Sequence, residues 1–129
     1  MPILSHLESV AAVAEASVSE EHFSYAVRDF LDGFYAHPSS LGLDQEPRFL
    51  AEVLHDQGYA DAYLAALAEH LSGQYTLPLP AWSQNPTRSL REPRFAYKTP
   101  EGRIFLLIES PTAFRVRNIF ISAEGMTRA

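Results

Sequence analysis

Apolar residues recur at helical spacing in the first part of the chain. One stripe comprises Ile3, Leu4, Leu7, Val10, Ala11 and Ala14. A second stripe, with three phenylalanines on one face, comprises Phe23, Ala26, Val27, Phe30, Leu31 and Phe34. These stripes predict helices over about 3–15 and 19–37. Ser17 and Glu20, three residues apart, match a capping box at the start of the second helix.

Two more helices are expected after a loop at residues 38–42. Pro47 suits the first turn of a third helix, where the missing N–H has no partner to lose, and Gly58 is expected to end it. A fourth helix is predicted over about 59–72, with Gly73 at its C-terminal cap. Its apolar stripe comprises Tyr63, Leu64, Leu67, Ala68 and Leu71. The short connection at Gly58 favours an antiparallel pair of helices.

The pattern changes after residue 75, because Pro78, Pro80, Pro86 and Pro93 fall close together. Residues 94–98 and 103–108 flank Thr-Pro-Glu-Gly at 99–102, a composition typical of a type I turn, and they predict a β-hairpin. Ser110 and Pro111 are then expected as the N-cap and first residue of a short helix. A last strand is predicted at 119–121, and the tail can end in one more helical turn.

These elements predict one domain over residues 1–129, of the α+β class and predominantly helical. Residues 1–75 form its N-terminal helical bundle. Residues 76–129 form a proline-rich arm with a C-terminal hairpin, a short terminal helix or strand and a basic tail. Helices followed by strands argue against an alternating, doubly wound sheet.

Composition excludes several kinds of site and destination. The chain has no cysteine, so it has no disulfide, no thiolate zinc site and no cysteine nucleophile. The first residues lack the basic start and unbroken apolar core of a signal peptide. No stretch approaches the ~20 apolar residues of a membrane span, so we expect no membrane association and a cytoplasmic location.

Charge divides the chain into two parts. Residues 1–85 contain two basic and twelve acidic side chains, whereas residues 86–129 contain eight basic and four acidic ones. One interpretation is that the basic segment packs on the acidic part and neutralises it. The other is that it offers a basic face to an acidic partner or a nucleic acid.

No motif specifies a reaction. The histidines all lie in the acidic part and show no metal-binding spacing: His6, His22, His37, His55 and His70. Asp29 and Asp32 are three residues apart, but we expect them on the solvent face of their helix. Because there is also no nucleophile elbow or glycine-rich phosphate loop, we predict no catalytic residue, cofactor or metal.

Basic and aromatic residues interleave in the second part of the chain. Arg115 and Arg117 flank Val116, and five more basic residues precede them, Arg88, Arg91, Arg94, Lys98 and Arg103. With Phe95, Tyr97 and Phe105 between them, they resemble the surface of a single-strand nucleic-acid binder. A half-buried hairpin shows the same alternation, so both interpretations stay open.

The segment ESPTAFRVRNIFI at 109–121, with Pro-Ala-Trp at 80–82 and Glu-Pro-Arg-Phe at 92–95, resembles the C-terminal part of a group of small bacterial proteins. The resemblance spans about residues 59–129. Several members resemble the antitoxin or regulatory half of two-gene modules, beside a nucleotidyltransferase-like toxin, and some carry an N-terminal helix-turn-helix. This chain departs from the last feature, since its first forty residues are acidic and hold one arginine.

The favoured hypothesis is therefore a non-catalytic, antitoxin-like interaction module whose partner is another protein, with a homodimer possible. Arg115, Arg117, Trp82 and Phe114 are the predicted partner-binding residues, although core packing is the alternative for Trp82 and Phe114. The first alternative is a transcriptional regulator that binds nucleic acid through the basic part. The second is an enzyme with an acid–base site built from the acids and histidines of the first part.

Overall fold

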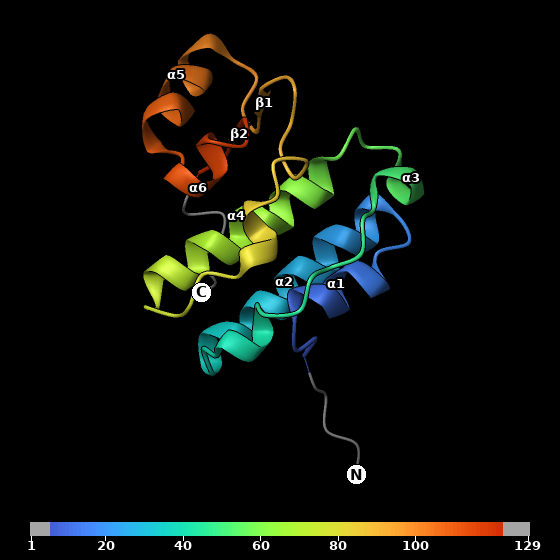
Figure 1. The fold of residues 1–129 in the computed structure, drawn as a ribbon. Helices are drawn as coiled ribbons and strands as arrows, with labels where there is room; N and C mark the ends of the chain where they lie inside the picture. The colour runs from blue at the N-terminus through green and yellow to red at the C-terminus, as the bar shows by residue number, and fades with distance from the viewer. Residues whose placement is uncertain (1–5, 123–129) are drawn as a thin grey trace.

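The computed structural model describes residues 6–122, and Figure 1 shows α4 between a helical layer on one side and the C-terminal arm on the other. The helices are α1 (Val10–Ala16), α2 (Glu20–Ala36), α3 (Ala51–Leu54), α4 (Tyr59–Gln74), α5 (Pro100–Glu109) and α6 (Thr112–Arg115). Two 3-10 helices cover Ser40–Gly42 and Ala81–Gln84, and the strands are β1 (Arg94–Phe95) and β2 (Ile119–Phe120). The described part is thus mostly helical, with a two-stranded parallel sheet, which agrees with an α+β class poor in strand.

The first two helices are confirmed, but their ends differ from the prediction. α1 begins at Val10, because the Ser9 hydroxyl accepts from the N–H of Ala12, and residues 1–5 lie outside the described part. The predicted capping box is wrong. Ser19 is the N-cap of α2, so Glu20 is already the first helical residue and cannot close the box.

The predicted third helix is reduced to one turn. Pro47 lies in a non-helical segment, and α3 begins only at Ala51. The reason is Asp61 on α4, whose carboxylate accepts from the N–H groups of Leu50 at 2.6 Å and Ala51 at 3.2 Å. The start of α3 is thus capped by a side chain of α4, and the sequence around α3 alone does not predict that cap.

α4 forms the centre of the core. Leu64, Leu67 and Leu71 are fully buried, and the helix is covered on most of its circumference. The prediction that Gly73 caps this helix is wrong, since α4 continues to Gln74. The turn is instead completed by Thr76, whose φ is 55°, and by a hydrogen bond from Leu77 N–H to the carbonyl of Ser72.

The predicted hairpin is wrong. Thr99 is an N-cap that accepts from the N–H of Gly102 at 3.0 Å, so Thr-Pro-Glu-Gly begins the helix α5 and does not form a turn. β1 pairs instead with β2, in parallel, with Phe95 stacked on Phe120 at 4.6 Å between ring centroids. Ser110 ends α5, and Pro111 is the N-cap of α6.

The predicted short terminal helix and last strand are confirmed as α6 and β2. The further helical turn expected at the tail lies outside the described residues. Within the described part, no helix is long and apolar enough to cross a membrane.

Candidate partner-binding surface

Arg117, a predicted partner-binding residue, lies inside the molecule. Its guanidinium donates to the carbonyls of Ala113 at 2.7 Å and Ser83 at 2.6 Å, and to the carboxylate of Glu69 at 2.9 Å. Burial raises the pKa of Glu69, but hydrogen bonds from Gln84 and Arg117 outweigh it and hold this pKa below its usual value. Arg117 therefore joins the arm to α4.

Phe114 and Trp82 also support the fold. Phe114 is fully buried, with its ring 5.1 Å from Tyr63 and 6.2 Å from His70. Trp82 is half-buried, and its indole N–H donates to the carbonyl of Leu43 at 2.9 Å. The core-packing alternative thus describes where these two side chains lie. They would affect partner binding by positioning the surface residues that pack over them, and a role in partner binding stays a prediction.

Arg88 was grouped with the surface cations, but its side chain is completely buried. It donates to Glu46 at 3.1 Å and to the carbonyl of Pro47 at 2.6 Å, and its guanidinium lies over the rings of Phe49 and Trp82. The interpretation that the basic segment packs on the acidic part therefore describes Arg88 and Arg117. It does not describe Arg91, Arg94, Lys98 and Arg103, which are exposed.

The most unusual surface of the arm is the outer side of α5. Four large apolar side chains are exposed there: Ile104 (60%), Phe105 (46%), Leu107 (49%) and Ile108 (68%). Only Leu106 of this helix is buried. At helical spacing the four residues cover one continuous side, which we call the α5 face. Figure 1 shows α5 on the far side of the molecule from α1.

Tyr97 extends the α5 face. Its ring stacks on Phe105 at 6.3 Å, and it is 46% exposed. A β-carbon on Gly102 would lie only 2.7 Å from the β-carbon of Tyr97, so the glycine makes room for this contact. Sequence reasoning missed the face because it assigned these residues to a hairpin. The i, i+3, i+4 spacing of Ile104, Leu107 and Ile108 is typical of one face of a helix and could have identified it.

Arg115 is the predicted partner-binding residue that lies beside the α5 face. It is half-buried, and its guanidinium donates to the carbonyl of Leu107 at 3.3 Å and to the hydroxyl of Thr112 at 3.2 Å. The exposed Val116 follows it. Arg115 therefore holds the C-terminal end of α5 and adds a positive charge next to its apolar side chains.

A groove of about 1070 Å³ runs along the start of the arm. Its cationic lining consists of Arg91, Arg94, Lys98 and Arg103. Arg94 lies 4.0 Å over the ring of Tyr59, and Arg103 lies 5.4 Å over Phe95. Asp56 and Glu92 also line the groove, so its charge is mixed. Four of the expected basic residues and one of the expected aromatic residues, Phe95, come together in this groove.

A second groove, of about 560 Å³, contains two of the N-terminal histidines, His6 and His37, together with Glu8. The Nδ1 of His6 lies 3.0 Å from Asp29. Burial raises the pKa of Asp29, but hydrogen bonds from the Leu7 N–H and from His6 outweigh it and lower this pKa overall. The serines that line this groove cap helices, so no nucleophile is hydrogen-bonded to His6 within the described residues.

The described residues contain no cluster of candidate metal ligands. No group of three or more histidine, aspartate or glutamate side chains lies close enough to hold an ion between residues 6 and 122. Burial lowers the pKa of His70, which packs against Phe114.

Comparison with known proteins found no match among family models, curated proteins or solved structures. The resemblance to antitoxin-like bacterial proteins therefore stays a prediction, carried by the residues of the 109–121 segment.

Proposed function

We propose that this chain is a non-catalytic interaction module that uses the α5 face to bind another protein. The observation that carries this proposal is the exposure of Ile104, Phe105, Leu107 and Ile108 on one side of α5. A contiguous apolar patch on a small protein marks an interaction site, because leaving it in water promotes aggregation. An amphipathic helix of this kind docks into an apolar groove on its partner.

The charges around the face favour a partner of a different kind over a second copy of this chain. Residues 91–115 carry five basic and three acidic side chains. A symmetric dimer through α5 would bring these net positive surfaces together, which opposes association. A partner groove with acidic residues at its rim would complement both the apolar side chains and the cations.

The role of the 109–121 segment follows from where its side chains lie. Phe114, Arg117 and Ile119 are buried, and Arg115 holds the end of α5. We infer that this motif builds the platform that presents α5, while α5 itself contacts the partner. In keeping with the resemblance, the proposed partner is a nucleotidyltransferase-like toxin encoded beside this chain, which the bound module would neutralise.

Co-expression with the product of the adjacent gene tests the proposal. The double variant Ile104→Glu, Ile108→Glu places two charges on the α5 face, and we expect it to abolish both co-purification and neutralisation. The matched control is Leu41→Glu, since Leu41 is 78% exposed and lies far along the chain from α5. A double variant that stays folded, binds and neutralises like the original chain refutes the proposal. A stable dimer that forms through α5 refutes the choice of partner.

The basic groove favours a second candidate, nucleic-acid binding. Arg91, Arg94, Lys98 and Arg103 supply phosphate contacts, and Phe95 supplies an aromatic ring beside them. Binding of this kind weakens steeply as salt rises. A titration with labelled single-stranded oligonucleotide at low and moderate salt tests it, with Arg94→Met and Arg103→Met as variants. Absence of binding at low salt eliminates this candidate.

A further inference from the structure

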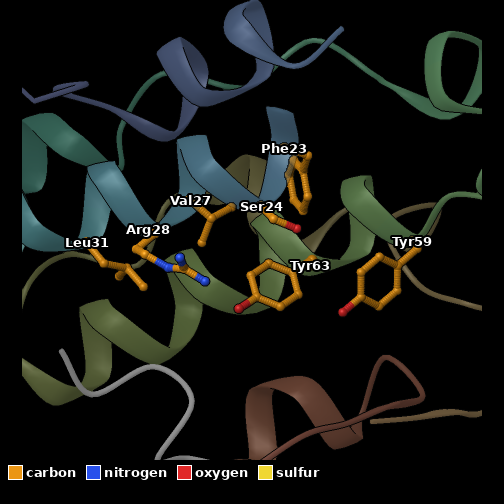
Figure 2. Close-up of a pocket in the computed structure, with 7 residues that line it drawn as sticks. All are labelled: Phe23, Ser24, Val27, Arg28, Leu31, Tyr59 and Tyr63. Carbon is orange, nitrogen blue, oxygen red and sulfur yellow. The ribbon is translucent and has the colours of Figure 1, made fainter. Parts of the chain in front are cut away.

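A separate pocket lies between α2 and α4, away from the α5 face. Its volume is about 210 Å³. Figure 2 shows Phe23, Ser24, Val27, Arg28 and Leu31 arriving from α2, with Tyr59 and Tyr63 arriving from α4. Phe23, Val27 and Leu31 are buried and give the pocket an apolar wall. The other lining residues, Ser24, Arg28, Tyr59 and Tyr63, carry polar groups, so the pocket combines an apolar wall with polar groups, as small-molecule sites do.

Three polar groups of this pocket have no partner among residues 6–122. Arg28 is exposed and makes no ion pair or hydrogen bond there, and the hydroxyls of the half-buried Tyr59 and Tyr63 make none either. Figure 2 shows the Arg28 guanidinium and the Tyr63 hydroxyl extending toward each other across the opening. Five N–H donors and two phenols are therefore available to a bound molecule.

The two arginines at the pocket outnumber the carboxylate, Asp56, that acts on Tyr59, and this balance of charge favours an anion. Arg28 lies at one side, and Arg94 stacks on the ring of Tyr59 at the other, 4.0 Å from its centroid. Burial raises the pKa of Tyr63, so its hydroxyl remains a hydrogen-bond donor at neutral pH. A guanidinium and a phenol can each donate a hydrogen bond to an oxygen of the same carboxylate.

The volume of the pocket limits the size of the ligand's apolar part. A protein cavity of roughly 150 Å³ can hold benzene. A pocket of about 210 Å³ thus has room for one ring, or a branched chain of similar size, with a carboxylate attached. We propose that this pocket binds a small monocarboxylate with an aromatic or branched apolar body, with its carboxylate on Arg28 and the tyrosine hydroxyls. The proposal does not depend on the function of the α5 face.

Amide chemical shifts of the full chain, titrated with benzoate, test this site. We expect shifts confined to α2 and α4 with a Kd of about 1 mM, because a ligand this small has few atoms to contribute. Benzyl alcohol has the same ring and no charge, and we expect it to bind at least about tenfold more weakly. Inorganic phosphate, which lacks the apolar body, should leave these residues unshifted.

Substitutions of Arg28 and Tyr63 test whether these residues bind the carboxylate of benzoate. Arg28→Met keeps the apolar stem and removes the charge, and we expect about tenfold to hundredfold weaker binding of benzoate. Arg28→Lys should retain part of the affinity, and Tyr63→Phe should lose a smaller part. Arg91→Met, which removes a cation outside this pocket, is the matched control and should bind normally.

Three results overturn the proposal. One is the absence of shifts in α2 and α4 at about 20 mM benzoate, a concentration that would saturate a site of this strength. Another is equal binding of benzoate and benzyl alcohol. The third is unchanged benzoate binding by Arg28→Met and Tyr63→Phe variants whose spectra show that they are folded.

Discussion

Arg117 donates a 2.9 Å hydrogen bond to Glu69, which lies 48 residues earlier in the chain. The same guanidinium binds the carbonyl of Ala113 on α6 and that of Ser83 in a 3-10 helix. One side chain thus holds together α4, α6 and the 3-10 helix Ala81–Gln84 of the arm. In this account the 109–121 segment keeps the arm in place, and the partner contacts α5.

Removing the Arg117 guanidinium should destabilise the chain. Arg117→Met removes the donor to two carbonyls and leaves the Glu69 carboxylate with only its hydrogen bond from Gln84, and we expect a loss of about 2–4 kcal/mol. Urea unfolding followed by far-ultraviolet circular dichroism measures it. Arg115→Met is the control and should lose less than about 1 kcal/mol, since Arg115 makes long hydrogen bonds near the surface. Equal losses in the two variants would contradict the structural role of Arg117.

Acid should weaken the fold in part through Glu69. Its pKa in the folded state is below 4.5, so its contribution to the free energy of unfolding is present above that pH and disappears as pH falls through the folded pKa. Glu69→Gln should therefore be less stable than the original chain at pH 7, with a difference that shrinks below about pH 4. Urea midpoints measured between pH 3 and 7 test this. A difference that stays constant over that range contradicts it.

Two glycines on helices should respond to alanine in opposite directions. A β-carbon at Gly102 meets Tyr97 at 2.7 Å and the Thr99 hydroxyl at 2.9 Å, so Gly102→Ala should disturb the cap and the α5 face. A β-carbon at Gly73 meets nothing within 4 Å, and its φ is not positive. Gly73→Ala should stabilise the chain by about 0.5–1 kcal/mol, the usual gain for this exchange within a helix.

Thermal unfolding of the two alanine variants distinguishes these expectations. If Gly102→Ala also raised the midpoint by as much as Gly73→Ala, then Tyr97 would not pack on this glycine as the structure shows, and the extension of the α5 face would be wrong.

The long amphipathic helices were predictable from sequence, because their apolar stripes are local. The stripe of Phe23, Phe30 and Phe34 located α2, and that of Leu64, Leu67 and Leu71 located α4. α5 was not, since Thr-Pro-Glu-Gly suits both a turn and a helix start. In the structure, the Thr99 hydroxyl caps α5, and Gly102 packs against Tyr97 in the first turn of this helix.

The candidate site was only partly predictable for a similar reason. A sequence identifies arginines, but their burial depends on acceptors that come from distant segments. All the acceptors of Arg88 and Arg117 except the Ala113 carbonyl lie 27 to 48 residues away in the sequence, while Arg115 lies near the surface. Of the four predicted partner-binding residues, Phe114 and Arg117 are buried and Trp82 and Arg115 are half-buried, and their binding of a partner stays a prediction.

Contact between α5 and the partner is what the proposed function requires. Hydrogen exchange of the full chain, alone and saturated with the adjacent-gene product, tests it most directly. We predict slower exchange concentrated in residues 97–109, with little change in α2. Slower exchange in α2 or at the basic groove, with residues 97–109 unchanged in a saturated complex, would contradict it.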